Sequence, residues 1–157
     1  MPFSSLGLHP DLLRGVKELG FQRPTPIQKD AIPPAMSGRD VLACAMTGSG
    51  KSAAFLLPIL NQLHPKKRGV TRALILTPTR ELAAQIDEHL RELAVHTPLS
   101  GAAIYGGVGM GPQEHASRSG VDVLISAPQK GWSAPPSAGV VMLTEDALER
   151  CKGAQST

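Results

Sequence analysis

The feature that most constrains this chain is a loop of small residues, Ala45-Met46-Thr47-Gly48-Ser49-Gly50-Lys51-Ser52. The apolar run 41–45 leads into it and is predicted to be a buried strand, and the run 53–57 after it is typical of a helix. Small residues let successive main-chain N–H groups curve around an anion, and the next helix adds its positive dipole end. The pattern predicts a phosphate-binding loop; the alternative is a glycine-rich turn between a strand and a helix.

Two side chains at the end of this loop add chemistry to it. The Lys51 ammonium can reach the outer phosphates of a nucleotide, where it would act in catalysis, and the Ser52 hydroxyl can be a ligand of Mg²⁺. The usual pattern is G-x-x-x-x-G-K-S/T, and Ala45 stands at its first glycine. The loop therefore predicts that the chain binds a nucleotide with its metal ion.

Bulk composition allows one globular, intracellular domain. The chain has 157 residues, of which 41% are hydrophobic, and a net charge of +3. This charge suits an anionic partner and is also ordinary for a soluble protein. The basic cluster 66–68 is interpreted as a solvated loop rather than a nucleic-acid patch. The two cysteines, Cys44 and Cys151, have no metal-ligand spacing, and Cys44 lies in the predicted buried strand.

No targeting signal or bilayer-spanning run is expected from the sequence. The first residues lack a basic region followed by an apolar one, and no apolar run approaches the roughly 18 residues that crossing a membrane requires. We therefore expect a cytoplasmic protein without a membrane partner.

Hydrophobic periodicity predicts alternating helices and strands. Thr25 and Pro26 are predicted to start the second helix, which Pro33-Pro34 interrupts or restarts. Such alternation favours an α/β domain with a mostly parallel sheet, whose ligands gather at the carboxyl ends of the strands. The predicted helices cover about 8–19, 25–37, 52–63, 79–93 and 112–116, and the predicted strands cover 41–45, 73–76, 102–105 and 121–125.

The composition changes after Ile125. Residues 126–139 are rich in proline, glycine and serine, which is typical of a loop or of disorder. Residues 139–143 could be one more strand, and 145–151 a last helical turn or two. We therefore divide the chain into an ordered part, 1–125, and a divergent or disordered tail, 126–157.

Three further segments narrow the interpretation. They are residues 21–28 (Phe-Gln-Arg-Pro-Thr-Pro-Ile-Gln), residues 78–82 (Pro-Thr-Arg-Glu-Leu) and the pair Gly106-Gly107. Taken in order with the phosphate loop, they closely resemble the first RecA-like domain of DEAD-box RNA helicases, from Phe3 to Ile125. The resemblance implies a RecA-like P-loop domain, a mostly parallel sheet flanked by helices, that is incomplete at its C-terminus.

The resemblance implies roles in binding ATP. Gln28 is similar to the family's adenine reader, whose amide donates and accepts at once. Phe21 matches the aromatic residue that stacks on the base, and Phe3 matches an upstream aromatic near the same pocket. The alternatives are an exposed helical glutamine and plain core packing of the two phenylalanines.

The resemblance also implies contacts with an RNA backbone. Pro78, Thr79 and Arg80 match the element that touches RNA, and Gly106 and Gly107 would let the strand approach the main chain. Such contacts read backbone shape, so little sequence preference is expected. The alternative for Arg80 is a helix-surface arginine paired with neighbouring glutamates.

Two segments depart from the family pattern. Residues 126–130 replace the Thr-Pro-Gly-Arg segment, which puts the RNA contact there in doubt. Residues 143–147 stand nearest the Asp-Glu-Ala-Asp segment, and only Glu145 falls in register, with Thr144 in place of the metal-organising aspartate. Glu145 is therefore a catalytic candidate; the alternative is an acidic residue at a helix start.

The expected function is that of a truncated DEAD-box ATP-dependent RNA helicase. Catalysis by this chain alone is not expected, because the second RecA-like domain, which closes over ATP, is absent from the sequence. The alternative is a non-catalytic remnant that binds adenine nucleotide and, more weakly, RNA. A small P-loop kinase is disfavoured, since it would need neither residues 21–28 nor 78–82.

Overall fold

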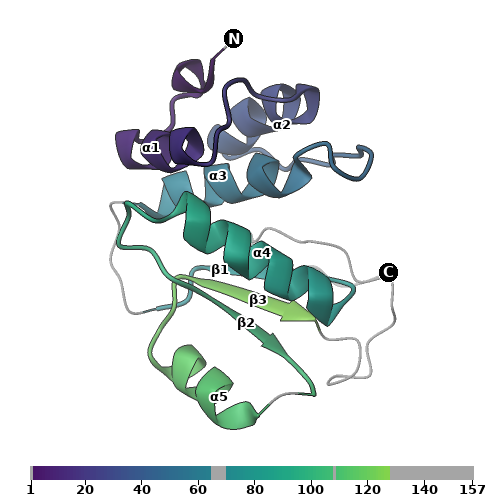
Figure 1. Cartoon of the computed structure of the whole chain (residues 1–157), viewed down its shortest axis with the longest axis vertical. Helices are drawn as coiled ribbons and strands as arrows, with labels where there is room; N and C mark the ends of the chain where they lie inside the picture. Colours follow the sequence, from purple (N-terminus) through teal and green to yellow (C-terminus); the bar gives the residue numbers. More distant parts are fainter. Residues whose placement is uncertain (1, 65–69, 108, 128–157) are drawn as a thin grey trace. The chain divides into compact units, whose positions relative to one another are not determined.

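The computed structural model describes residues 2–64, 70–107 and 109–127, so the predicted tail, Glu145 and the basic cluster 66–68 lie outside the described residues. Figure 1 shows the elements in chain order. No helix in these ranges is both long and apolar enough to cross a bilayer. The elements are η1 (Phe3–Leu6), α1 (Pro10–Glu18), α2 (Pro26–Met36), α3 (Lys51–Leu63), β1 (Ala73–Leu76), α4 (Arg80–Leu93), β2 (Gly101–Tyr105), α5 (Met110–Arg118) and β3 (Val123–Ala127).

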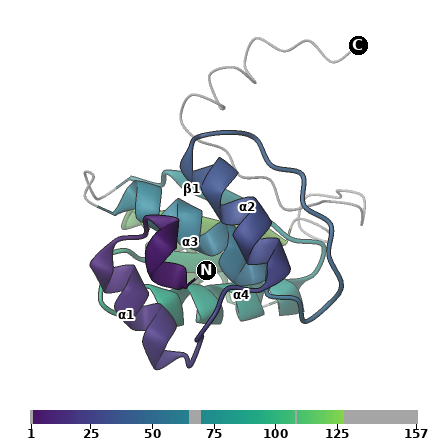
Figure 2. The ribbon, with the colours of Figure 1, turned by 90° about the horizontal axis from the view of Figure 1, so that it is seen from above.

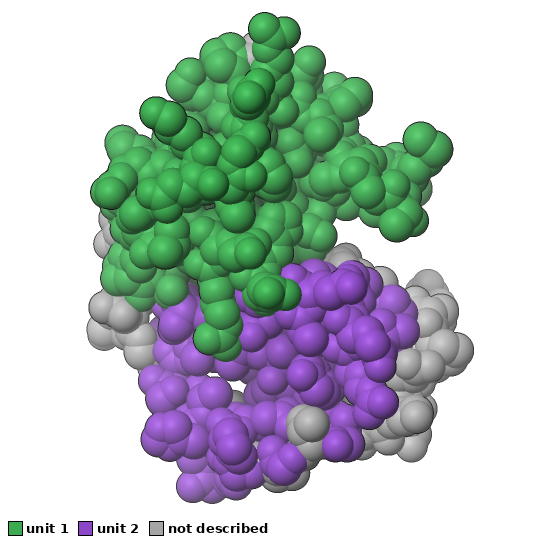
Figure 3. Space-filling view, viewed as in Figure 1, with its two compact units in different colours: residues 1–66, 88–99 green, residues 67–87, 100–157 purple. Residues whose placement is uncertain are grey.

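The chain forms two compact units, coloured separately in Figure 3. Unit 1 comprises Met1–Lys66 and Glu88–Leu99, and unit 2 comprises Lys67–Asp87 and Ser100–Thr157. Unit 1 therefore holds the three N-terminal helices and the phosphate loop, and unit 2 holds the sheet.

In unit 1, α2 and α3 pack side by side (Figures 1 and 2). Apolar residues occur all around α3, and most of them are buried, as the sequence predicts. Helix α1 begins with Pro10 in its first turn, where a missing N–H does no harm, and Leu12 and Val16 are buried. These three helices supply the core that supports the loop before α3.

Helix α2 continues through its two prolines. It starts after Thr25, as predicted, and it ends at Met36 rather than at Pro33-Pro34. The Pro33 carbonyl already accepts a hydrogen bond from the Ser37 main-chain N–H at 3.1 Å. The helical ladder therefore resumes within one turn, which is why the prolines neither end α2 nor start a new helix.

In unit 2 the three described strands are parallel in the order β1-β3-β2. Ile125 of the central strand pairs with Ile75 on one side and with Ala103 on the other. A fully buried central strand is typical of a parallel sheet, and Val123 and Ile125 are both buried. The predicted α/β class with a parallel sheet is confirmed.

Strand β3 lies two residues later than the predicted strand 121–125. Asp122, which the prediction placed inside the strand, instead anchors its start. Its buried carboxylate accepts hydrogen bonds from Arg72 Nη2 at 2.7 Å and from the Ser100 main-chain N–H at 3.0 Å. The strand extends to Ala127, and Ser126, expected in the divergent tail, pairs with Leu76.

The predicted buried strand at 41–45 is wrong. No described strand pairs with these residues, which belong to a wide arc between α2 and α3 (Figure 2). Leu42 is 97% exposed, and Cys44, expected to be buried, is exposed as well. An apolar run becomes a strand only when a neighbour supplies the ladder of hydrogen bonds, and the run alone does not specify that neighbour.

Candidate nucleotide and RNA sites

The loop 45–52 turns sharply at two glycines. Gly48 and Gly50 have φ values of +78° and +87°, in the left-handed region that residues with a Cβ avoid. Helix α3 begins at Lys51, directly after Gly50. The free N–H groups at the start of this helix therefore end the loop, as a phosphate-binding site requires.

The Lys51 side chain folds back over the loop. Its ammonium Nζ donates hydrogen bonds to the Ala45 carbonyl and to the Met46 carbonyl, the latter at 2.7 Å. The charge thus lies at the loop itself, and main-chain oxygens hold it. A triphosphate would compete with these two carbonyls for the ammonium.

Gln28 lies directly against the loop. The residue is only 3% exposed. Its amide oxygen accepts a hydrogen bond from the Thr25 main-chain N–H at 2.9 Å. Its amide nitrogen donates to the Gly50 carbonyl at 3.1 Å. The structure therefore brings the predicted adenine reader to the residue next to Lys51, although 22 positions separate Gln28 from Gly50 in sequence.

One hydroxyl beside this contact, the buried Ser49 Oγ, has no hydrogen-bond partner among the described residues. Leaving a buried polar atom unpaired costs about 1–3 kcal/mol. Together with the free helix N-terminus, this hydroxyl suits a polar ligand such as a nucleotide. Thr25 forms a capping box with Gln28 at the start of α2. Ser52, the predicted Mg²⁺ ligand, lies in the first turn of α3.

The two predicted adenine-site aromatics contact each other. The rings of Phe3 and Phe21 stack with centroids 6.4 Å apart, and Phe21 meets the edge of His89 at 6.1 Å. Phe3 is buried in the core of unit 1, so its packing role is observed, whereas Phe21 keeps part of its surface exposed. Phe3 and His89 thus both contact the ring of Phe21, whose predicted stacking on a base stays a prediction.

His89, which the sequence interpretation did not single out, borders Phe21. Burial lowers the pKa of the His89 imidazole from its ordinary 6.5, and the nearby Glu92 carboxylate opposes that shift. The neutral ring is therefore the favoured form beside Phe21. No local motif marks this histidine, because only folding brings α4 to residue 21.

The predicted RNA-contacting residues meet within unit 2. Thr79 Oγ1 accepts a hydrogen bond from the Leu82 N–H at 3.2 Å and caps α4, as predicted. Gly107 follows β2, and its φ is +89°. A Cβ at Gly107 would lie 2.9 Å from Arg80 Nη1, so the guanidinium lies against this glycine. Pro78 lies in the loop before α4, and Gly106 lies in the loop after β2.

Arg80 also pairs with a neighbouring glutamate, as the alternative interpretation of a helix-surface arginine predicts. Its Nε donates to Glu81 Oε1 at 2.9 Å, with both side chains largely exposed. An exposed ion pair contributes only about 0–1 kcal/mol, so it does not hold the guanidinium strongly. The ion pair with Glu81 and the position beside Gly107 coexist, and the contact of Arg80 with RNA stays a prediction.

A parallel α/β domain with a glycine-rich loop before a helix defines the P-loop class of proteins. Within that class, the family model for the DEAD/DEAH box helicase matches residues 25–135. The chain belongs to the DEAD/DEAH box helicase family.

Curated relatives agree with this assignment. The chain is 50% identical over 127 residues to the ATP-dependent RNA helicase SrmB of Escherichia coli, covering 79% of this chain and 29% of SrmB. It is 48% identical to the DEAD-box ATP-dependent RNA helicase 28 of rice, covering 80% of this chain and 16% of that helicase. The chain thus spans less than a third of the length of these relatives.

A solved structure also resembles this one. The RNA helicase Prp28 from Chaetomium thermophilum, crystallised with ADP, superposes with a TM-score of 0.76 at 39% identity. The match covers 82% of this chain and 32% of Prp28. The predicted RecA-like helicase fold is therefore confirmed.

Proposed function

We propose that this chain binds ATP with Mg²⁺, and RNA more weakly, as the ATP-binding part of an RNA helicase. The observation that carries the proposal is the hydrogen bond between Gln28 Nε2 and the Gly50 carbonyl at 3.1 Å. It joins the residue expected to read adenine to the loop expected to hold phosphates. The named activities of SrmB and the ADP bound to Prp28 support the same conclusion.

The Gln28 amide keeps the capacity that adenine recognition needs. An amide has two N–H donors and an oxygen with two lone pairs, and one of each is used by Gly50 and Thr25. The remaining donor and lone pair suit adenine N7 and the exocyclic amine. Guanine offers an acceptor where adenine has that amine, so the amide favours ATP over GTP.

The phosphates would lie against the start of α3. Lys51 would exchange its two carbonyl partners for the outer phosphates, and Ser52 would provide one oxygen ligand for Mg²⁺. The metal would neutralise phosphate charge. The sequence has Thr144 where the family has its metal-organising aspartate, so we expect binding without RNA-stimulated release of phosphate.

Equilibrium titration with ATP and GTP tests the proposal. We expect tighter binding of ATP; Lys51→Ala should weaken binding of both nucleotides by about 2 kcal/mol, since it removes a charged hydrogen-bond donor. Gln28→Ala should weaken ATP binding more than GTP binding, because the adenine contact is lost in addition to the hydrogen bond to Gly50. The exposed residues Lys17 and Gln22 provide matched controls, each changed to Ala. Equal affinity for ATP and GTP in the parent chain would contradict the proposal.

RNA binding is tested separately with a single-stranded RNA of mixed sequence. Arg80→Ala should weaken binding and reduce its salt dependence by about one counterion, whereas Arg14→Ala, an exposed arginine of α1, should not. If RNA increases the rate of phosphate release, the chain is an active enzyme and the proposal of a non-catalytic binding module is wrong.

A further inference from the structure

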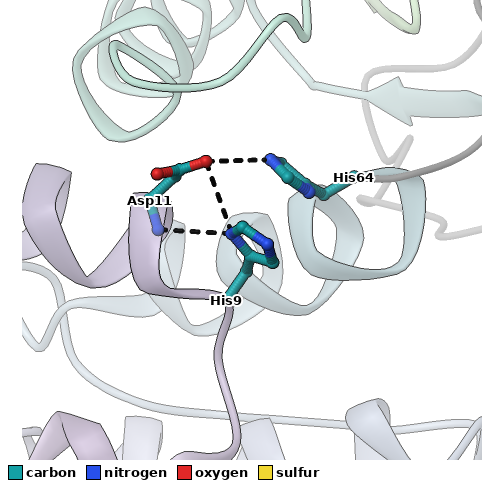
Figure 4. A group of neighbouring side chains, drawn as sticks. All are labelled: His9, Asp11 and His64. Carbon is teal, nitrogen blue, oxygen red and sulfur yellow. Dashed lines mark hydrogen bonds and ion pairs between the residues drawn. The ribbon is translucent and has the colours of Figure 1, made fainter.

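A cluster of three metal-binding side chains lies in unit 1, apart from the residues assigned to nucleotide or RNA. Figure 4 shows His9, Asp11 and His64 pointing toward one another. One ligand atom from each, a histidine nitrogen or a carboxylate oxygen, lies within 4.8 Å of the others. We propose that these three residues form a Zn²⁺ site that joins the start of α1 to the end of α3.

The distances suit a single tetrahedral ion. Asp11 Oδ2 lies 3.5 Å from His9 Nδ1 and 3.4 Å from His64 Nε2. Ligand atoms bonded to tetrahedral zinc at about 2.0–2.1 Å are about 3.4 Å from one another, so the carboxylate is already correctly spaced. Two imidazoles and a carboxylate are the ligand types that zinc takes, and water would be the fourth ligand.

Burial at His64 points to a ligand. The His64 side chain is only 12% exposed, and neither of its ring nitrogens has a hydrogen-bond partner among the described residues. The 3.4 Å separation from Asp11 is an ion-pair distance without hydrogen-bond geometry. Buried ring nitrogens are normally paired, so an ion on Nε2 would satisfy an otherwise unexplained polar atom.

The main chain holds the cluster in place. The His9 main-chain N–H donates to Asn61 Oδ1 on α3 at 2.7 Å, which ties the two helices together beside the three ligands. Asp11 lies in the first turn of α1, and His64 is the C-cap residue directly after α3. The backbone that carries the three ligands is therefore already held in place before an ion binds. This lowers the entropy lost on binding.

Binding requires a modest local change. The His9 and His64 rings stack with centroids 3.8 Å apart at 30°, and His9 Nδ1 accepts a hydrogen bond from the Asp11 N–H at 3.2 Å. The rings must rotate about χ2, a broad torsion, so that their in-plane lone pairs converge on the ion. The hydrogen bond at Nδ1 would be exchanged for a metal bond.

Titration of the full chain with Zn²⁺, with Mg²⁺ as the comparison ion, tests the site. We expect one Zn²⁺ per chain, a thermal unfolding temperature that rises with Zn²⁺ and not with Mg²⁺, and strong visible absorption when tetrahedral Co²⁺ replaces zinc. His64→Ala and Asp11→Asn should each weaken Zn²⁺ affinity by about 100-fold or more, since even outer-shell changes cost up to that much.

Two controls separate the site from other zinc ligands. His115→Ala alters an exposed histidine outside the cluster and should leave zinc affinity unchanged. A variant with Cys44→Ser and Cys151→Ser should keep the site, because thiols are not part of it. Loss of zinc binding in the thiol-free variant, or unchanged affinity in His64→Ala, would overturn the proposal. So would variants that alter stability in metal-free buffer while Zn²⁺ has no effect, since the cluster would then be purely structural.

Discussion

At the scale of single residues, Gly50 is the most constrained position in the candidate nucleotide site. Its φ of +87° suits glycine, and a Cβ there would lie 2.5 Å from Gln28 Nε2 and 3.2 Å from Thr25 Oγ1. Gly48 has a similar φ of +78°, but nothing lies within 4 Å of its added Cβ. A substitution at Gly48 therefore adds backbone strain alone, whereas a substitution at Gly50 adds both backbone strain and a steric clash.

Gly50→Ala should destabilise the chain more than Gly48→Ala. Both changes strain the left-handed backbone by about 1–3 kcal/mol, and only the first also displaces Gln28. Urea unfolding of the two variants measures the difference, and ATP affinity should fall further in Gly50→Ala. Adding Gln28→Ala should remove the excess effect. Equal losses of stability in the two single variants would show that Gln28 does not lie against Gly50 in solution.

His89 should make stability depend on pH. Because burial lowers its pKa below 6.5 in the folded chain, the unfolded chain binds the proton more readily between the two pKa values. The stabilising contribution of the neutral ring is therefore present above pH 6.5 and is lost as the pH falls below it. Urea unfolding of the parent and of His89→Gln between about pH 5 and pH 8 measures this contribution.

The free energy of unfolding of the parent, relative to that of His89→Gln, should decrease at low pH. Above neutrality this difference should stay constant. Titrations of the other histidines occur in both proteins and cancel in the difference. Glu92→Gln removes the carboxylate that opposes the pKa shift, so it should steepen the dependence. A difference that does not vary with pH would mean that His89 is as hydrated in the folded chain as in the unfolded one.

At the scale of secondary-structure elements, α1 meets the end of α4 through a glycine. A Cβ added at Gly15 would lie 2.5 Å from the Leu93 carbonyl oxygen, which is main chain and cannot move aside easily. Helical glycine is normally less stable than alanine by about 1 kcal/mol, so its presence in α1 needs a reason. Close packing of the two helices supplies that reason.

Gly15→Ala should therefore destabilise the chain despite its better helix propensity. Gly111, within α5, is the matched control, because its added Cβ would meet nothing within 4 Å. Gly111→Ala should raise the free energy of unfolding by up to about 1 kcal/mol. Thermal or urea unfolding of both variants distinguishes the effects, and a stabilising Gly15→Ala would mean that α1 does not approach Leu93 so closely.

At the scale of the whole molecule, the arc 41–46 carries three of the exposed large hydrophobic residues among the described ones. Leu42 and Met46 are 97% and 84% exposed, and Val41 is 42% exposed. The segment has no regular secondary structure and no strand beside it among the described residues. Exposed apolar backbone of this kind favours association between copies of a chain.

Leu42→Glu should reduce self-association without loss of stability. Substituting a side chain this exposed changes the free energy of unfolding by no more than about 0.5 kcal/mol. The added charge opposes strand pairing between copies of the chain. Sedimentation velocity measures the association, and Gln22→Glu, at another exposed position, controls for the added charge. A loss of more than about 1 kcal/mol in Leu42→Glu would show that residue 42 is buried in solution, as the sequence pattern had predicted.

Local patterns in the sequence predicted most of the helices, two of the strands approximately as observed, and the family. Helical periodicity located α1, α3 and α4, and the short apolar run 73–76 gave β1, because local spacing and capping residues such as Thr79 encode these elements directly. The motif around Gln28, the phosphate loop and residues 78–82 predicted the helicase family, which the family model confirms. The roles of these residues in binding, the function of Glu145 and the cytoplasmic location stay predictions.

Contacts between residues distant in the chain follow from the folded structure alone. The folded structure leaves 41–45 unpaired among the described strands, begins β3 at Val123 directly after the buried Asp122, and brings Gln28 to Gly50. It also assembled His64 with a histidine and an aspartate from the start of α1, a grouping that no local spacing signals. Periodicity records only which face of an element is apolar, whereas partners distant in the chain are chosen by packing and hydrogen bonding across the fold.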